Sequence, residues 1–145
     1  MNSATKITFV YPDFESFGIE CLMSVCVANG IDVELVYYEA QNAYLGTKND
    51  AINYSTIATR IISTVPCIVA FSCVTDNFQD QIKCARALKQ INQNVFTIFG
   101  GIHITAVPDL VIKYPEVDSI AIGEAEISLI EFIKKCGGGV KKREI

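Results

Sequence analysis

The sequence predicts an α/β domain with a doubly wound, five-stranded parallel sheet. Short apolar runs alternate with longer stretches in which apolar residues recur every three or four positions, the pattern of strands followed by amphipathic helices. Two of the runs, C-I-V-A-F and V-F-T-I-F, are almost wholly apolar, as expected for parallel strands that helices cover on both faces. The default strand order for such a chain is 2-1-3-4-5.

Five stretches are expected to form the strands, each bounded by proline, glycine or a polar cluster. The first ends at Pro12 and Asp13, and the last ends at Gly123. In chain order the strands are residues 7–11, 31–38, 67–71, 95–99 and 119–122. This arrangement is the flavodoxin-like, or Rossmann-like, fold class.

The intervening stretches carry single-faced helical patterns with recognisable ends. Asn49 or Asp50 is expected to cap the second helix, which runs to Pro66. Asp76 followed by Gln79 resembles a capping box for the third helix. The other helices are expected at residues 16–29, at 108–113, where Pro108 suits a first turn, and at 126–135.

Composition excludes several classes of protein. The 145 residues suffice for one domain with a full core, and a hydrophobic share of 50% argues against disorder. A net charge of −4 gives no electrostatic basis for nucleic-acid binding. No apolar run approaches the roughly 20 residues that span a bilayer, and the first residues lack the basic-then-apolar pattern of a secretion signal, so we expect neither. We therefore expect a cytoplasmic protein without nucleic-acid or membrane partners.

The six cysteines stand singly, without a C-x-x-C pair. Such spacing is not that of a zinc or iron–sulfur site. We expect the cysteines to be reduced and mostly part of the core.

The expected ligand position is the carboxyl edge of the sheet, where open α/β sheets bind their ligands. Gly100 and Gly101 end the fourth strand there, and glycine allows the backbone to approach a ligand closely. His103, the single histidine in the chain, follows them. A tight turn without a ligand is the alternative interpretation.

Three common functions of this fold class, flavin binding, dinucleotide binding and the receiver domain, fit the strand ends poorly. The loop after the first strand reads D-F-E-S-F-G (residues 13–18), which is too acidic for a flavin phosphate and lacks the G-x-G-x-x-G of a dinucleotide site. A receiver domain needs an aspartate at the end of the third strand, where Ser72 and Cys73 stand.

The same loops resemble the three-part signature of cobalamin-binding domains, D-x-H-x-x-G, then S-x-L, then G-G. Here the parts are D-F-E-S-F-G, S-C-V and G-G. Two positions depart from the pattern: Glu15 replaces the cobalt-ligating histidine and Val74 replaces leucine.

A closer resemblance covers nearly the whole chain. The runs I-V-A-F-S-C-V-T-D, I-F-G-G-I-H-I-T-A-V-P and V-D-S-I-A-I-G-E-A-E are similar to the amino-terminal cobalamin-binding domain of class B radical S-adenosylmethionine enzymes. That group includes anaerobic magnesium-protoporphyrin monomethyl ester cyclase-like and cobalamin-dependent methyltransferase-like proteins. The resemblance implies that residues 1–136 bind cobalamin and that 137–145 are a linker or the start of a radical domain. That partner domain, expected beyond residue 145, would carry the 4Fe-4S cluster and S-adenosylmethionine.

The resemblance also implies where the cofactor lies, with the corrin over the sheet edge and the nucleotide tail beside strands three to five. The residues implied as cofactor contacts are Asp13, Glu15, Gly18, Ser72, Cys73, Val74, Thr75, Gly100, Gly101, Ile102, His103, Gly123 and Glu124. Because Glu15 replaces the histidine, no imidazole of the first loop is expected to ligate cobalt, and no catalytic residue is expected. For Asp13, Glu15 and Glu124, helix capping is the alternative role.

The function implied is a cobalamin module that is silent alone and positions its cofactor for methyl transfer or oxidative cyclisation by the partner domain. Two alternatives remain. One is a degenerate domain that serves as an interaction module. The other is a corrinoid carrier protein, which would carry a histidine at position 15.

Overall fold

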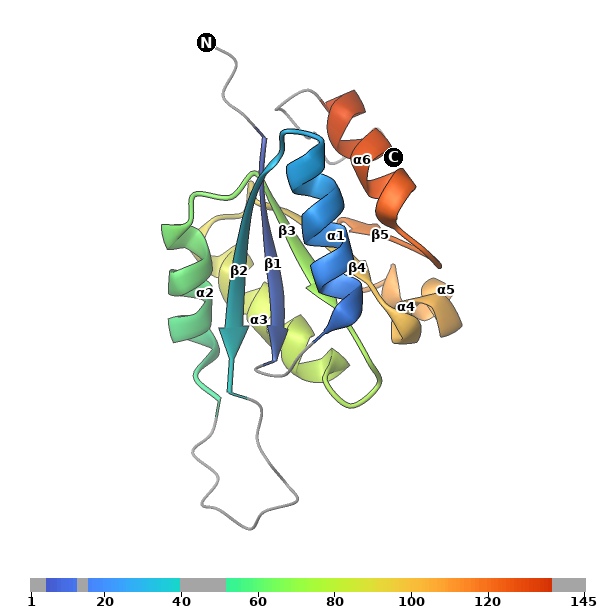
Figure 1. The fold of residues 1–145 in the computed structure, drawn as a ribbon. Coiled ribbons are helices and arrows are strands. Elements are labelled where there is room, and N and C mark those ends of the chain that lie inside the picture. Colours follow the sequence, from blue (N-terminus) through green and yellow to red (C-terminus); the bar gives the residue numbers. More distant parts are fainter. Residues whose placement is uncertain (1–4, 13–15, 40–51, 137–145) are drawn as a thin grey trace.

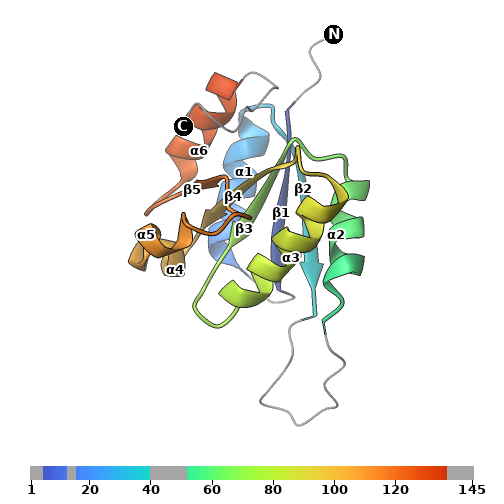
Figure 2. The ribbon, with the colours of Figure 1, turned by 180° about the vertical axis from the view of Figure 1, so that it is seen from behind.

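The computed structural model, which describes residues 5–12, 16–39 and 52–136, contains a five-stranded parallel sheet in the order β2-β1-β3-β4-β5. Helices cover both faces of the sheet (Figures 1 and 2). The strands are β1 (Lys6–Pro12), β2 (Asp32–Tyr38), β3 (Ile68–Ser72), β4 (Phe96–Gly100) and β5 (Ser119–Ile120). The predicted fold class and strand order are confirmed.

Helices α1 and α6 pack on one face of the sheet, and α2 and α3 pack on the other. The short helices α4 and α5 follow β4 at the carboxyl edge (Figure 1). The bounds are α1 (Phe17–Ala28), α2 (Tyr54–Ser63), α3 (Phe78–Ile91), α4 (Ile102–Ala106), α5 (Pro108–Val111) and α6 (Glu126–Cys136). Within the described ranges, no helix combines the length and the apolar character that crossing a bilayer requires.

Alternate strand residues enter two separate cores, because side chains of a strand point to opposite faces in turn. Val10, Phe71 and Phe99 pack against α2 and α3, and the rings of Phe71 and Phe99 stack with centroids 4.7 Å apart. Phe9 and Phe96 pack on the other face, toward α1 and α6. The sheet is therefore buried on both faces, as the apolar runs predicted.

Two helix starts differ from the sequence-based expectation. Helix α2 begins at Tyr54, and its cap is Asn53, whose Oδ1 accepts a hydrogen bond from the Thr56 amide at 3.0 Å; the predicted caps at 49 and 50 lie outside the described residues. The capping box at Asp76 is wrong. Helix α3 begins at Phe78, and the Oδ1 of its N-cap residue Asn77 accepts from the Val74 amide at 3.0 Å instead of capping the helix.

Three further boundaries differ near the carboxyl edge. Residues 102–106, expected as part of a turn, form α4, which is five residues long and too short to show a helical period in the sequence. Helix α5 ends at Val111 rather than at 113, and β5 ends at Ile120 rather than at 122.

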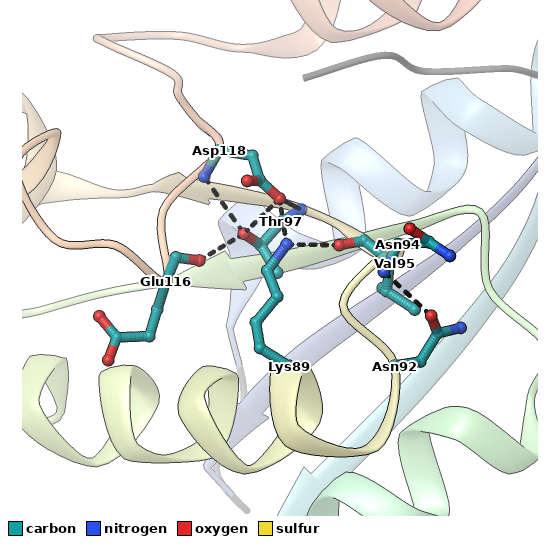
Figure 3. Close-up of polar contacts among 7 residues, drawn as sticks. All are labelled: Lys89, Asn92, Asn94, Val95, Thr97, Glu116 and Asp118. Atoms are coloured by element: carbon teal, nitrogen blue, oxygen red, sulfur yellow. Dashed lines mark hydrogen bonds and ion pairs between the residues drawn. The ribbon is translucent and has the colours of Figure 1, made fainter.

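A polar network fixes the edge strand β5 to the rest of the sheet (Figure 3). The Lys89 ammonium of α3 donates to the Val95 carbonyl and pairs with the Asp118 carboxylate, which is 1% exposed. Asp118 Oδ2 also accepts from the Thr97 amide at 2.9 Å, and the Asp118 amide donates to Thr97 Oγ1 at 3.2 Å. The network joins α3, β4 and the start of β5.

We expect Lys89→Met to lower the free energy of unfolding by about 3–5 kcal/mol, because it leaves the buried Asp118 carboxylate without its ammonium partner. The measurement is urea unfolding followed by circular dichroism. The matched control is Lys83→Met on the same helix. Lys83 is exposed, and its Nζ lies 5.6 Å from the centre of the Tyr54 ring. Its replacement should therefore lower the free energy of unfolding by only about 0.5–1 kcal/mol. Equal losses for the two variants would contradict a structural role for the network.

Candidate functional site

A cleft opens on the face of the sheet that carries α1 and α6, at the carboxyl ends of β3 and β4. Its volume is about 380 Å³, near the lower end of the range for small-molecule sites. The lining comes from β1, β3 and β4, from α1, α4 and α6, and from residues 121–125.

Small side chains on neighbouring strands create the floor of this cleft. Ala70 of β3 pairs in register with Phe9 of β1 and with Ile98 of β4. Two residues nearer the carboxyl edge, on the same face, Ser72 pairs with Gly100. Because Ala70, Ser72 and Gly100 extend little above the sheet, the space between α1 and α6 is not filled there.

Glycines also keep the walls open. Gly18 lies in the first turn of α1. A Cβ added there would have no protein atom within 4 Å, and the same holds for Gly123 after β5. Across the cleft, Ala125 and Leu129 belong to α6 and the segment that leads into it. The walls can therefore admit a flat or narrow ligand between the two helices.

The crevice between β1 and β3, where the chain reverses its direction across the sheet, is closed by Gln81 of α3. Its carboxamide Nε2 donates to the Ser72 carbonyl at 3.0 Å and to the Val10 carbonyl at 3.3 Å, and the residue is fully buried. This crevice is the usual ligand position in open α/β sheets. The open cleft instead lies beside β3 and β4.

Gly101 brings the ends of β3 and β4 into close contact. Its φ is +102°, and an added Cβ would lie 2.6 Å from the Cys73 carbonyl oxygen and 2.8 Å from the Cys73 nitrogen. The Cys73 amide donates to the Gly100 carbonyl at 2.8 Å, and the His103 amide donates to the Cys73 carbonyl at 3.2 Å. The two glycines thus have different roles: Gly100 faces the cleft and Ala121, whereas Gly101 also permits this backbone approach.

Thr105 of α4, which the sequence-based site did not include, connects the two loops at the mouth of the cleft. Its hydroxyl donates to the Gly101 carbonyl at 3.1 Å and accepts from the Gly123 amide at 3.0 Å. This contact joins the loop after β5 to the loop after β4. The threonine stands two residues after the histidine of the G-G-x-H-x-T run, a spacing that places it on the cleft side of the short helix.

His103 lies on the other side of these loops, toward α3. Its ring packs against Phe78 with centroids 4.5 Å apart, and its Nδ1 lies 3.3 Å from the Thr75 hydroxyl. Cys73 is 1% exposed, and burial raises the pKa of its thiol far above the ordinary value. A buried, protonated thiol is a poor nucleophile.

The structure therefore divides the predicted contact residues into three groups. Those that line the cleft are Gly18, Ser72, Gly100, Gly101, Ile102, Gly123 and Glu124. Cys73, Val74, Thr75 and His103 lie in or against the loop that leads into α3. Asp13 and Glu15 lie outside the described residues.

The cleft also contains residues that sequence reasoning missed, namely Phe9, Leu22, Ala70, Phe71, Ile98, Thr105, Ala121, Ala125, Glu126 and Leu129. The charged side chains in the described lining are the carboxylates of Glu124 and Glu126 at the start of α6. No cluster of three His, Cys, Asp or Glu side chains suited to a metal ion occurs in the described part of the chain.

A doubly wound parallel sheet with an open, small-residue cleft at its carboxyl edge defines a ligand-binding domain of the Rossmann-like class. The sequence matches the family of B12 binding domains over residues 7–133, and the chain belongs to this family. The resemblance to cobalamin-binding domains is thereby confirmed.

The curated relatives are longer enzymes. An uncharacterized methyltransferase, PH0819, from Pyrococcus horikoshii is 33% identical over 89 residues, which are 61% of this chain and 19% of that protein. The cobalamin-dependent radical SAM methyltransferase TokK from Streptomyces tokunonensis is 36% identical over 69 residues, 47% of this chain and 10% of TokK. A 2-(S-pantetheinyl)-carbapenam-3-carboxylate methyltransferase from Streptantibioticus cattleyicolor is 34% identical over 71 residues, 48% of this chain and 10% of that enzyme.

Among solved structures, the CheY-like protein TadZ from Pseudomonas aeruginosa PAO1 has a similar fold. The TM-score is 0.62 at 12% identity, with 96% of this chain and 98% of that chain covered. This likeness shows the fold and carries no statement about function.

We expect Gly101→Ala to lower the free energy of unfolding by about 1–3 kcal/mol from its backbone conformation alone, because φ +102° with ψ −179° is a region that glycine alone adopts readily. The close approach to Cys73 adds to this loss. Gly18→Ala, in a helix and with open space around the new Cβ, should be stabilising by about 0.5–1 kcal/mol. Urea unfolding of both variants checks the pair, and a neutral Gly101→Ala would refute the contact with Cys73.

Proposed function

We propose that the chain binds cobalamin in this cleft and serves as the cobalamin module of a radical S-adenosylmethionine enzyme. The observation that carries the proposal is the cleft of small residues at the carboxyl ends of β3 and β4, in a chain of the B12 binding family. The named relative TokK, a cobalamin-dependent radical SAM methyltransferase, supports the class of enzyme.

The size of the cleft indicates how the cofactor divides between cleft and edge. A volume of about 380 Å³ does not hold a whole corrinoid, whose ring system and nucleotide tail together are much larger. We infer that the nucleotide tail enters between α1 and α6 while the corrin ring lies over the carboxyl edge. Gly18, Gly100 and Gly123 leave room for the tail, and Ser72 lines the same cleft.

The loop at 13–18 and the single histidine bear on how cobalt is held. Glu15 stands at the position where the resembled domains carry their ligating histidine. His103 is packed against Phe78 and next to Thr75, on the side of α3. We therefore propose that no imidazole from the 13–18 loop ligates cobalt, so that the cofactor is bound base-off and histidine-off.

The chain's part in the reaction is binding and orientation. Cobalamin, when bound, supplies group-transfer chemistry at its cobalt atom. A partner domain with a 4Fe-4S cluster and S-adenosylmethionine would complete the enzyme, for methyl transfer or oxidative cyclisation. The segment that matches this chain makes up only 10–19% of each relative, so most of each relative lies outside it and can include such a domain.

A second function is favoured by the apolar rim of the cleft. Ile102 lines the cleft and is 73% exposed, and Phe17 and Ile122, which are 80% and 58% exposed, are next in sequence to the lining residues Gly18 and Gly123. Apolar side chains exposed together are typical of an interaction surface. A domain that had lost cobalamin could use this rim to pair with another protein, and it would remain colourless when offered the cofactor.

Incubation with hydroxocobalamin under anaerobic conditions, followed by desalting, is expected to leave about one equivalent of corrinoid on the chain. Gly18→Leu should remove at least nine-tenths of the retained corrinoid, because it adds a bulky side chain at a cleft-lining position where the new Cβ has no protein atom within 4 Å. Ala28→Leu is the matched control, since Ala28 is exposed on the last turn of α1 and does not line the cleft.

Visible absorption of the retained corrinoid is the measurement for both parts of the proposal. Equal retention by the two leucine variants would contradict binding in the cleft. A spectrum of cobalt coordinated by imidazole would contradict the base-off, histidine-off state.

A further inference from the structure

The part of the cleft farther from the carboxyl edge is lined by hydrocarbon. Five of the lining side chains, from β1, β3, β4, α1 and α6, contain no polar atom: Phe9, Ala70, Ile98, Leu22 and Leu129. Phe9, Ala70 and Ile98 form one register row across the three strands and are 2%, 8% and 6% exposed. The backbone groups of this row belong to the parallel ladders.

The polar lining residues lie nearer the carboxyl edge. Ser72 is two residues closer to the carboxyl edge than Ala70, and Thr105 is hydrogen-bonded to Gly101 and Gly123 at the mouth. Glu124 and Glu126 stand before and at the start of α6, one turn ahead of Leu129. The apolar row of Phe9, Ala70 and Ile98 therefore lies farther from the carboxyl edge than the Ser72 and Thr105 side chains.

This gradient matters for the base that ends the nucleotide tail of a corrinoid. In a benzimidazole the six-membered ring carries only carbon and hydrogen. In adenine the corresponding ring carries two nitrogen acceptors and an amino group. Burying those groups against hydrocarbon removes their water without supplying partners, which is unfavourable.

We propose that the floor of Phe9, Ala70 and Ile98 makes the chain selective for corrinoids with a benzimidazole lower base over those with a purine base. The inference rests on the proposed function, since it concerns the part of cobalamin assigned to this cleft. The selectivity is assigned to the row of Phe9, Ala70 and Ile98, because Ser72, nearer the edge, can hydrogen-bond groups that both kinds of tail share.

The test compares three pure compounds on the same chain: cobalamin, the cobamide with adenine as lower base, and cobinamide, which has no nucleotide. Dissociation constants come from equilibrium dialysis with detection of corrinoid absorbance. We expect cobalamin to bind at least tenfold more tightly than the adenine cobamide, a difference of about 1.4 kcal/mol. Cobinamide should also bind at least tenfold more weakly than cobalamin.

A pair of floor variants links the selectivity to this surface. Ala70→Ser places one hydroxyl among the apolar floor residues, so the preference for cobalamin over the adenine cobamide should shrink at least threefold. Ala70→Cys adds an atom of comparable size with little hydrogen-bonding capacity and should retain the preference. Equal preferences in the two variants would overturn the assignment to this floor.

The remaining outcomes separate the inference from the proposed function. If cobalamin and the adenine cobamide bind equally and cobinamide binds weakly, the cleft holds the tail and the selectivity is refuted. If cobinamide binds as tightly as cobalamin, the tail does not use the cleft and the inference fails while corrinoid binding stands. If none of the three binds, the proposed function fails, and the inference with it.

Discussion

The close contact between Gly101 and the backbone of Cys73 determines the arrangement at the carboxyl edge. It requires a residue without a Cβ, and it brings the β3 and β4 ends together through hydrogen bonds of Cys73 with Gly100 and His103. Helix α4 begins directly after this contact, so Thr105 is positioned to bond Gly101 and Gly123. The mouth of the cleft thus depends on the contact between Gly101 and the Cys73 backbone, which is separate from the floor of Phe9, Ala70 and Ile98.

The two faces of the sheet divide stability and binding between them. On the α2 and α3 face, large side chains such as Phe71 and Phe99 stack and fill the core. On the other face, Ala70, Ser72 and Gly100 occupy the alternate positions of the same two strands and leave space. Because successive strand residues point to opposite faces, five residues of β3 can contribute both to a dense core and to an open cleft.

The strand order and most elements were predictable because buried parallel strands and single-faced helices leave clear patterns. The glycine pair correctly marked the carboxyl edge, but its two members divide into a cleft residue and a contact residue, a difference that depends on where Cys73 lies in space. The apolar floor could not be found in the same way. In a run such as I-V-A-F-S every residue is compatible with burial, so only the register with Phe9 and Ile98 shows that Ala70 faces the cleft. Helix α4 was missed because five residues do not establish a period.

The central claim is that the cleft between α1 and α6 receives part of cobalamin. Titration of the isotopically labelled chain with diamagnetic hydroxocobalamin, followed by amide NMR shifts, tests it most directly. The account predicts the largest shift changes at Gly18, Gly100 and Gly123, which line the cleft, and little change at Thr59 on the outer surface of α2. Shift changes centred on α2 and α3, or none at saturating cobalamin, would contradict it.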